Sequence, residues 1–337
     1  MRTMRMTSST VRRALPLRAA FAGIVAATML LVCDTGLAST VSPFRYASAA
    51  LHRDQTALVY LPSGEAPLGG WPVLYLLHGL DGAPGDWSEL GNIKATLDKL
   101  IASHRAQPMA LVMPEGGNSW YVDSAAVGGP GDYETAVGSD LMDAVEDAFP
   151  VGADREHRAI GGVSMGGYGA LRLALGHPER FAAVAALSPA IWQNVPRSPD
   201  EPGGARHDHA PAMPYFQRVD PDTVVVGIDL PPAGSHFGTA FGSPFDPKRF
   251  NAANVFTLLQ NALEAKKALP AIYLAVGDDD SHGLWRGSIA FFETMQANAL
   301  PVEFRVMDGD HDWTLWRSAL TDLIVFVNAH LGRPAIR

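Results

Sequence analysis

The chain has 337 residues, 47% of them hydrophobic and 18% charged, which is an ordinary globular composition and enough for one large α/β domain or two small ones. Its formal net charge of −9 argues against nucleic acid or an anionic membrane surface as a partner. Its 33 glycines and 25 prolines favour a loop-rich enzyme over a helical bundle.

The N-terminus has the pattern of a secretory signal peptide. Five arginines precede an apolar run over residues 19–32, and Gly36-Leu37-Ala38 supplies a small-x-small cleavage site. Because the run is shorter than the ~20 residues that span a bilayer, we expect cleavage after Ala38 and no stable membrane insertion afterwards. The protein would then be secreted or periplasmic, with a signal peptide over 1–38 and a single domain over 39–337.

Cleavage at that point would change the chemistry of the mature chain. It removes five Arg and one Asp, which takes the formal net charge from −9 to −13. It also removes Cys33, the only cysteine, so we expect no disulfide, no cysteine nucleophile and no cysteine zinc site. Two other kinds of export signal fit the N-terminus less well. The residues around Arg12-Arg13 are poor for a twin-arginine signal, and Val32 is bulkier than the small residue that precedes a lipidated cysteine.

The following segments alternate between strand-like and helix-like patterns. Continuous apolar runs such as 73–77 are typical of strands buried on both faces of a parallel sheet, and a 3.6-residue apolar period predicts helices. The predicted strands are 55–61, 73–77, 110–113, 157–161, 182–187, 271–276 and 302–306. The predicted helices are 93–102, 133–149, 168–175, 252–265, 284–298 and 313–331, and 115–132 is a long loop. This alternation predicts an α/β fold with a mostly parallel sheet and helices on both faces.

Residues 191–249 break the alternation. Ten prolines interrupt this stretch, and only 223–228 has a strand-like pattern. Irregular insertions of this length inside a domain are usually functional lids or disordered. We interpret the segment as a loop-rich cap over the functional site.

The segment Gly162-Val163-Ser164-Met165-Gly166 lies between a predicted strand and a predicted helix. G-x-S-x-G in this context is the nucleophile elbow of α/β-hydrolases, in which a tight turn exposes the serine hydroxyl. By itself the motif also fits a simple tight turn, so the other catalytic residues must decide. In α/β-hydrolases an acid and then a histidine follow the serine in the chain.

Both partners follow at the ends of predicted strands. Gly277 and three aspartates, Asp278 to Asp280, come after one strand, and His311 comes after the next. Because the carboxyl ends of parallel strands meet at one edge of the sheet, we expect His311 to be the base for Ser164. Spacing alone does not choose among the three aspartates. They could also bind Ca²⁺, but they lack the ligand spacing of an EF-hand loop.

Two backbone N–H groups are expected to form the oxyanion hole. One belongs to Met165, directly after the serine, and the other to the loop that follows the 73–77 strand, where Leu80 is the expected donor. His78 in the same loop is expected to be a packed, hydrogen-bonded residue. Trp120 and Trp192 lie in loops after strands, so we expect them in the substrate pocket, with core or rim packing as the alternative.

Five motifs together are far more specific than G-x-S-x-G: Leu76-Leu77-His78-Gly79, Asp86-Trp87, Met113-Pro114 with Gly117-Asn118-Ser119-Trp120-Tyr121, Gly162-Val163-Ser164-Met165-Gly166-Gly167-Tyr168-Gly169-Ala170, and Gly309-Asp310-His311-Asp312-Trp313. Through them residues 50–331 resemble the esterase D family of α/β-hydrolases, which includes S-formylglutathione hydrolases, feruloyl and acetyl esterases and mycolyltransferases. The resemblance implies Ser164 as nucleophile, His311 as base and Asp280, three residues after the glycine of its turn, as the acid.

The sequence leaves three functions open. The first is an exported serine esterase acting on small-molecule or polysaccharide-linked esters, and the second is an acyltransferase with the same triad. The third, a non-catalytic binding protein, has no need of Ser, Asp and His at three separate turns. No cofactor and no metal are expected, because the sequence has neither a phosphate-binding glycine motif nor a metal-binding histidine cluster. The sequence does not predict the oligomeric state.

Overall fold

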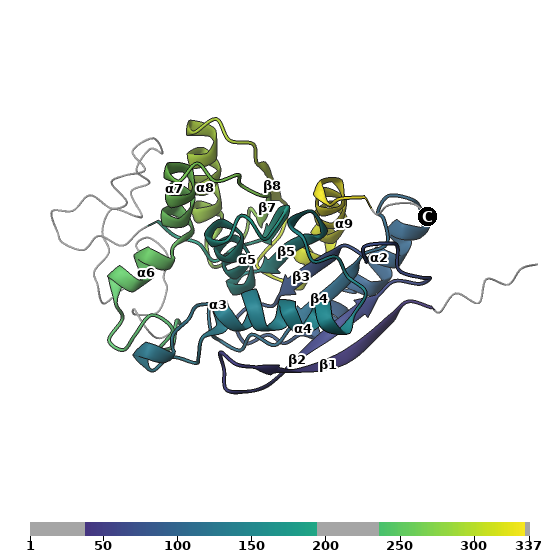
Figure 1. Ribbon diagram of the computed structural model, residues 1–337. Coiled ribbons are helices and arrows are strands. Elements are labelled where there is room, and N and C mark those ends of the chain that lie inside the picture. The colour runs from purple at the N-terminus through teal and green to yellow at the C-terminus, as the bar shows by residue number, and fades with distance from the viewer. Residues whose placement is uncertain (1–37, 194–235, 334–337) are drawn as a thin grey trace, which may run out of the picture. The chain divides into compact units, whose positions relative to one another are not determined.

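The computed structural model describes residues 38–193 and 236–333 (Figure 1). Residues 1–37 of the predicted signal peptide, 194–235 of the predicted cap and the strand predicted over 223–228 lie outside the described residues. In the described ranges, no helix is both long enough and apolar enough to cross a membrane.

Within residues 38–193 and 236–333, eight strands form one sheet in the order β1-β2-β4-β3-β5-β6-β7-β8. β2 pairs antiparallel with both β1 and β4, and every other neighbouring pair is parallel. The strands are β1 (Thr40–Ser48), β2 (Arg53–Leu61), β3 (Val73–Leu77), β4 (Ala110–Pro114), β5 (Arg158–Val163), β6 (Ala183–Leu187), β7 (Ala271–Gly277) and β8 (Glu303–Met307). The expected mostly parallel α/β sheet is therefore confirmed.

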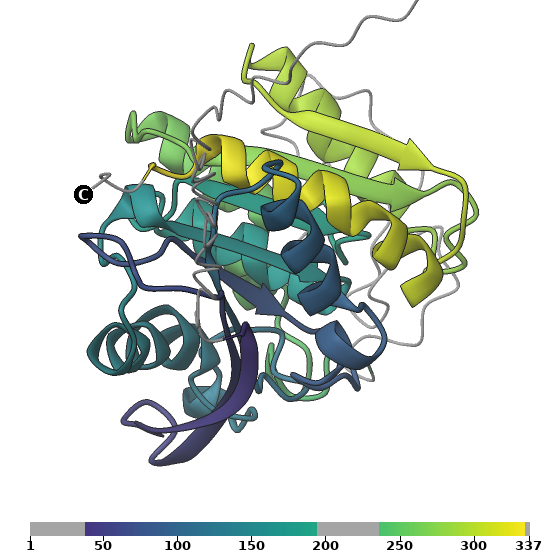
Figure 2. The same ribbon diagram turned by 90° about the vertical axis from the view of Figure 1, so that its right-hand side faces the viewer.

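Helices cover both faces of the sheet (Figure 2). One face carries α1 (Asp86–Glu89), α2 (Ile93–Ala102) and α9 (Trp313–His330), and Figure 2 shows α2 and α9 side by side in front of the strands. The other face carries α3 (Tyr133–Thr135), α4 (Leu141–Ala148), α5 (Met165–Gly176), α6 (Pro247–Ala253), α7 (Val255–Glu264) and α8 (Trp285–Ala297).

The central strand β3 shows why its sequence is a continuous apolar run. Val73, Tyr75 and Leu77 pack into the core on the α5 side. Leu74 and Leu76 pack into the core on the α9 side. All five side chains are fully buried, so alternation of side chains along the strand supplies both cores with hydrophobic groups.

The first strand was missed by the sequence patterns. β1 pairs with β2 along its whole length, from Thr40 opposite Leu61 to Ser48 opposite Arg53. It contains Pro43, which argues against a strand, and most of its side chains are at least partly exposed. Both features are tolerated because β1 is at the edge of the sheet, where the proline needs no second partner strand.

Two predicted helices are interrupted. The helix predicted over 133–149 consists of α3, a π-helical turn over Ala136–Asp140, and α4. The helix predicted over 252–265 is divided into α6 and α7 at Asn254, which is extended and accepts a hydrogen bond from the N–H of Phe256 as the cap of α7. The loop 115–132 contains one 3₁₀ turn, Ala125–Val127.

Candidate active site

The strand β5, the turn at Ser164 and the helix α5 form the expected nucleophile elbow. Ser164 has φ 55° and ψ −120°, a strained conformation that lifts its side chain away from the sheet. The two motif glycines leave room for this turn. A Cβ at Gly162 would collide with the carbonyl of Gly166, and a Cβ at Gly166 would collide with the carbonyl of Leu77. α5 begins at Met165, three residues earlier than predicted, so the serine immediately precedes the helix.

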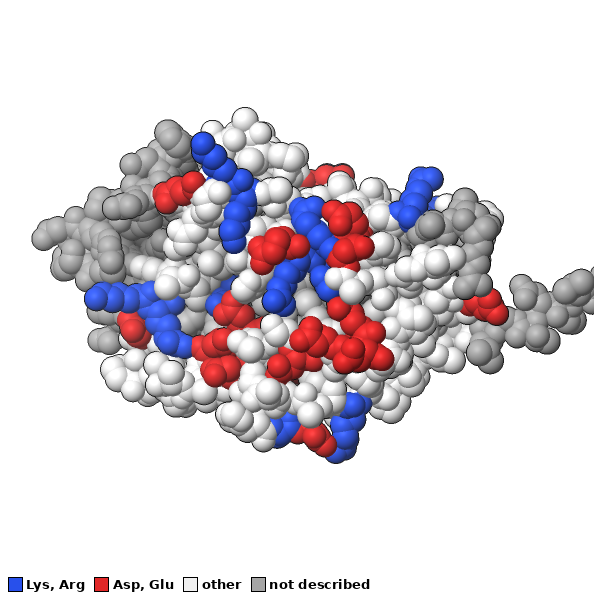
Figure 3. Space-filling view, in the orientation of Figure 1, with Lys and Arg blue, Asp and Glu red and all other residues white. Residues whose placement is uncertain are grey.

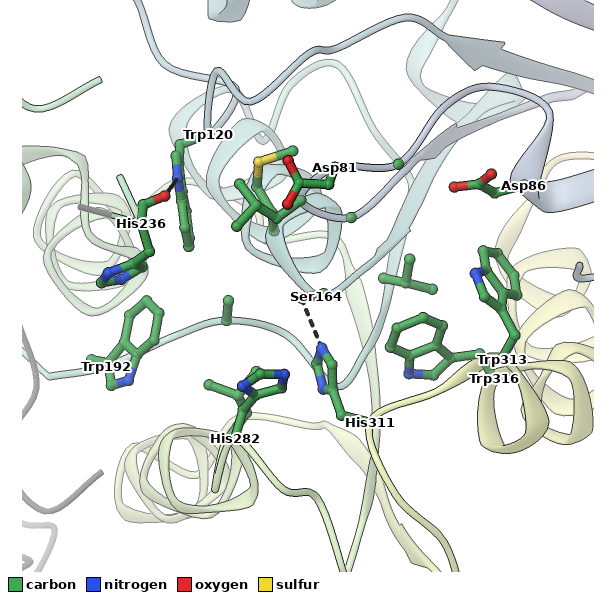
Figure 4. Close-up of a pocket in the computed structure, with 17 residues that line it drawn as sticks. Asp81, Asp86, Trp120, Ser164, Trp192, His236, His282, His311, Trp313 and Trp316 are labelled. Carbon is green, nitrogen blue, oxygen red and sulfur yellow. Dashed lines mark hydrogen bonds between the residues drawn. The ribbon is translucent and has the colours of Figure 1, made fainter. Parts of the chain in front are cut away.

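Ser164, His311 and Asp280 form a continuous hydrogen-bonded chain (Figure 4). The Ser164 Oγ lies 2.9 Å from His311 Nε2, and His311 Nδ1 lies 2.8 Å from Asp280 Oδ2. The two partners come from the loops after β8 and β7, which are neighbouring parallel strands. With Nδ1–H directed at the carboxylate, Nε2 is left to accept the serine proton.

Of the three consecutive aspartates, Asp280 is the one that contacts His311. It is 5% exposed, and its Oδ1 accepts hydrogen bonds from the N–H groups of His282 and Leu284. Asp278 and Asp279 instead lie at the surface, where their carboxylates come within 4.8 Å of one another and of the carboxylate of Asp308. This placement agrees with the acid that the family resemblance implied.

Two aromatic side chains flank His311, and the sequence predicted a position beside it for neither of them. The His282 ring lies 4.7 Å from the His311 ring, and the Trp316 ring lies 5.0 Å away on the other side. The indole N–H of Trp316 is fixed by the Ser188 hydroxyl at 3.1 Å. Burial, and then the adjacent His311, lower the pKa of His282, so this neighbour remains uncharged at neutral pH. His282 follows Asp280 by two residues, but no spacing rule indicates its position.

The predicted oxyanion donors lie beside the serine. Leu80 and Met165 both line the pocket that contains Ser164. Met165 is the first residue of α5, so its N–H has no partner within the helix. Gly79 allows the loop that carries Leu80 to approach Ser164, because even a Cβ at this position would lie 3.4 Å from the Ser164 Cβ. His78 is fully buried and hydrogen-bonded in this loop, as expected from the sequence.

The serine opens into a cavity of about 480 Å³. Figure 4 shows aromatic side chains on one side of Ser164, and we call Trp120, Trp192 and His236 the aromatic arm. The ring centroids of the two tryptophans are 6.0 Å apart, and burial lowers the pKa of His236 to about 4. On the other side lie Asp86, Trp313 and Trp316, and Asp81 also lines the cavity. Trp120 and Trp192 both line this cavity, but they are only 3% and 5% exposed and belong to the hydrophobic core, so the packing alternative also fits them.

Several known proteins with similar sequences or folds are esterases. The sequence profile described as "Putative esterase" matches residues 48–326. An acetyl esterase of Caldicellulosiruptor saccharolyticus is 28% identical over 74% of this chain and 80% of its own length. An esterase of Mycobacterium tuberculosis is 30% identical over 67% of this chain, and the match spans only 51% of that protein.

Solved structures also resemble the chain in fold. A ferulic acid esterase superposes with a TM-score of 0.64 at 28% identity, covering 87% of this chain and 99% of that one. An S-formylglutathione hydrolase from Agrobacterium tumefaciens has the same TM-score at 19% identity and shares the fold, covering 89% of this chain and 98% of its own. The sequence profile, the relatives and the hydrogen-bonded Ser164 together lead to one conclusion: the chain belongs to the putative esterase family of α/β-hydrolases and is a carboxylic ester hydrolase.

Proposed function

We propose that Ser164, His311 and Asp280 are the catalytic triad of this hydrolase and that it acts through an acyl-serine intermediate. The observation that carries the proposal is the continuous chain of hydrogen bonds, 2.9 Å and 2.8 Å long, from the serine hydroxyl to the buried carboxylate. A serine hydroxyl is a weak nucleophile unless a base accepts its proton, and the base must be held in the correct tautomer.

The first half-reaction forms the acyl-enzyme. Ser164 Oγ attacks the ester carbonyl carbon while its proton passes to His311 Nε2. The carbonyl oxygen becomes negatively charged and accepts hydrogen bonds from the N–H groups of Leu80 and Met165. As the intermediate collapses, the bond to the alcohol oxygen breaks and His311 returns the proton to that oxygen.

The second half-reaction releases the acid. Water gives a proton to His311 and attacks the acyl carbon, and the same two N–H groups stabilise the second oxyanion. The acyl–oxygen bond to Ser164 then breaks, and the serine regains its proton from His311. If an acceptor alcohol replaced water, the outcome would be acyl transfer, so adding an alcohol and measuring ester exchange separates hydrolase from acyltransferase.

We further propose that the aromatic arm takes the acyl group and favours aryl acids. Indole rings stack on aromatic groups, and 480 Å³ accommodates a hydroxycinnamoyl ester. The similarity to a ferulic acid esterase at 28% identity supports this substrate class. The alcohol would then be a small molecule or a sugar unit of a polysaccharide.

The decisive experiment compares wild type with Ser164→Ala on 4-nitrophenyl esters from acetyl to long acyl, and on 4-nitrophenyl ferulate. We expect the variant to lose about 10⁴-fold or more in kcat. We also expect Trp192→Ala to lose more on ferulate than on acetate. Full activity of Ser164→Ala would refute the triad. Equal losses on the two esters would refute the aryl site while leaving the triad intact.

A further inference from the structure

The loop that carries Leu80 is tied to a second loop, 115–121, which carries Trp120. The first tie runs through His78, whose Nε2 accepts a hydrogen bond from the N–H of Gly116 at 2.9 Å. Its Nδ1 therefore carries the ring proton and donates to the carbonyl of Gly79 at 2.8 Å. Because the carbonyl of Gly79 and the N–H of Leu80 belong to one peptide unit, this bond fixes the direction of the oxyanion donor.

The second tie is a reciprocal pair between Asp81 and Asn118. The N–H of Asp81 donates to Asn118 Oδ1 at 2.8 Å, and Asn118 Nδ2 donates to Asp81 Oδ1 at 2.7 Å. Asp81 has φ +57°, an uncommon conformation for a residue other than glycine. The amide of Asn118 pairs with the backbone N–H and one carboxylate oxygen of Asp81 in that conformation, and so fixes the peptide unit that follows Leu80.

We propose that Asn118 is a positioning residue of the oxyanion hole. Asn118 is not among the residues that line the pocket around Ser164. It holds the turn at Asp81, and this holds Leu80 with its N–H directed beside Ser164. The inference rests on the oxyanion hole proposed above. Asn118 is exposed and lies 37 residues from Asp81 in the chain, so sequence spacing gives no indication of the pair.

A positioning role makes a specific kinetic prediction. The oxyanion exists only around the transition state, so a misdirected Leu80 N–H lowers kcat and kcat/KM by the same factor and leaves KM unchanged. Loss of one complete oxyanion donor costs ~10²–10³-fold, and loss of the group that positions it should cost less, about tenfold. The factor should be equal for acetate and ferulate esters, because all esters share the oxyanion. Displacement of Trp120 would instead affect ferulate selectively.

Reversal of the hydrogen-bonding pair provides the sharpest test. Asn118→Asp places two carboxylates against each other and should lose about tenfold or more in kcat. Adding Asp81→Asn restores one amide and one carboxylate in exchanged positions. The double variant should therefore recover most of the kcat of Asp81→Asn alone. Asn118→Ala should lose about tenfold, and Asn261→Ala, an exposed asparagine on α7, is the matched control.

Thermal unfolding of each variant accompanies the kinetics, because both asparagines are exposed and the folded state should survive the substitutions. The proposal is overturned if Asn118→Ala and Asn118→Asp retain the kcat of Asn261→Ala, if the loss appears in KM alone, or if the double variant is no better than Asn118→Asp. None of these outcomes changes the test of the catalytic triad by Ser164→Ala. An inactive Ser164→Ala beside fully active Asn118 variants would therefore reject only the positioning role.

Discussion

Asp280 is held by three partners at once, His311 Nδ1 and the N–H groups of His282 and Leu284. We predict that Asp280→Asn lowers kcat by about 10³–10⁴-fold, because an amide donor opposite His311 Nδ1 favours the tautomer whose Nε2 carries a proton and cannot accept one from Ser164. Asp278→Asn, at the exposed neighbouring turn, is the control and should change kcat by less than about twofold. Steady-state hydrolysis with both variants measures this, and equal activities would contradict the assignment.

Activity should fall on the acid side of the pH–rate profile, because a protonated His311 cannot accept the serine proton. The lowered pKa of His282, caused by burial and then by His311, makes it a poor candidate for the group responsible. We therefore expect His282→Gln to retain an acid limb of the same form, whatever its effect on the rate. The profile of kcat/KM for both proteins tests this. A flat acid limb in the wild type would remove His311 as the base.

At the level of single residues, the sequence could predict a role only for groups whose position in the chain is itself diagnostic. Ser164 follows from its turn, and His311 from its position after a strand. Asp280 needed the family resemblance, since three adjacent carboxylates are equivalent until the fold buries one. Asn118 could not be assigned a role, because its contact with Asp81 depends on how two loops meet in space.

Among the elements, strong apolar periodicity predicted strands and helices correctly, whereas helix breaks set by capping residues were not predicted. The buried strands and α2 were predicted within about two residues because their side chains have no alternative to the core. The edge strand β1 was missed because only packing along β2 stabilises it. The break at Asn254 was missed because an asparagine in an apolar helical pattern caps a new helix here instead of continuing the old one.

An ion pair between α3 and α5 supports the loop that carries Trp120. Arg172 is buried on α5, where Nη2 lies 2.5 Å from Glu134 Oε2 and Nη1 donates to the carbonyl of Tyr121 at 3.2 Å. Trp120 and Tyr121 both have positive φ, 56° and 52°, and such consecutive strained residues need surrounding contacts to persist. Burial raises the pKa of Glu134, but hydrogen bonds and electrostatic attraction to His177 and Arg172 exceed this effect and lower the pKa to about 2.

We predict that Glu134→Gln lowers the free energy of unfolding by about 3 kcal/mol at neutral pH, because it leaves the buried Arg172 without its charged partner. A carboxylate whose pKa falls from 4.5 when unfolded to about 2 when folded contributes its full stability above pH 4.5. That contribution is lost as the pH falls towards 2, so the gap between wild type and variant should narrow in this range.

Urea unfolding at a series of pH values measures the difference in free energy of unfolding between wild type and Glu134→Gln. Glu303→Gln, in an exposed pair with Arg305, is the matched control and should cost less than about 1 kcal/mol. A gap that stays constant from neutral pH to pH 2 would show that the carboxylate charge of Glu134 is not what stabilises the fold.

For the whole molecule, the distribution of charge constrains the partners. Figure 3 shows acidic side chains across the face that carries α4, with basic ones among them. α4 contributes Asp143, Glu146 and Asp147, and Arg158 donates to Glu146 at 2.7 Å. On the described part of this face, acidic groups would repel a polyanion. We therefore continue to expect no nucleic-acid partner.

Export is the last proposal, and it concerns the chain as a whole. We propose that residues 1–38 are removed during secretion, because a basic segment, a short apolar run and Gly36-Leu37-Ala38 precede the fold. The first strand begins at Thr40, so cleavage after Ala38 would leave the sheet intact.

Expression of the full chain in a bacterial host, followed by intact mass measurement of the exported protein, should give a mature chain that starts at Ser39. Ala38→Arg should block cleavage, because a large charged residue does not fit the signal peptidase site. Cys33→Ser should change nothing. A lipid-modified chain that starts at Cys33 and disappears in Cys33→Ser would contradict the proposal and show a lipoprotein instead, whereas an unprocessed chain inside the cell would show that the N-terminus is not an export signal.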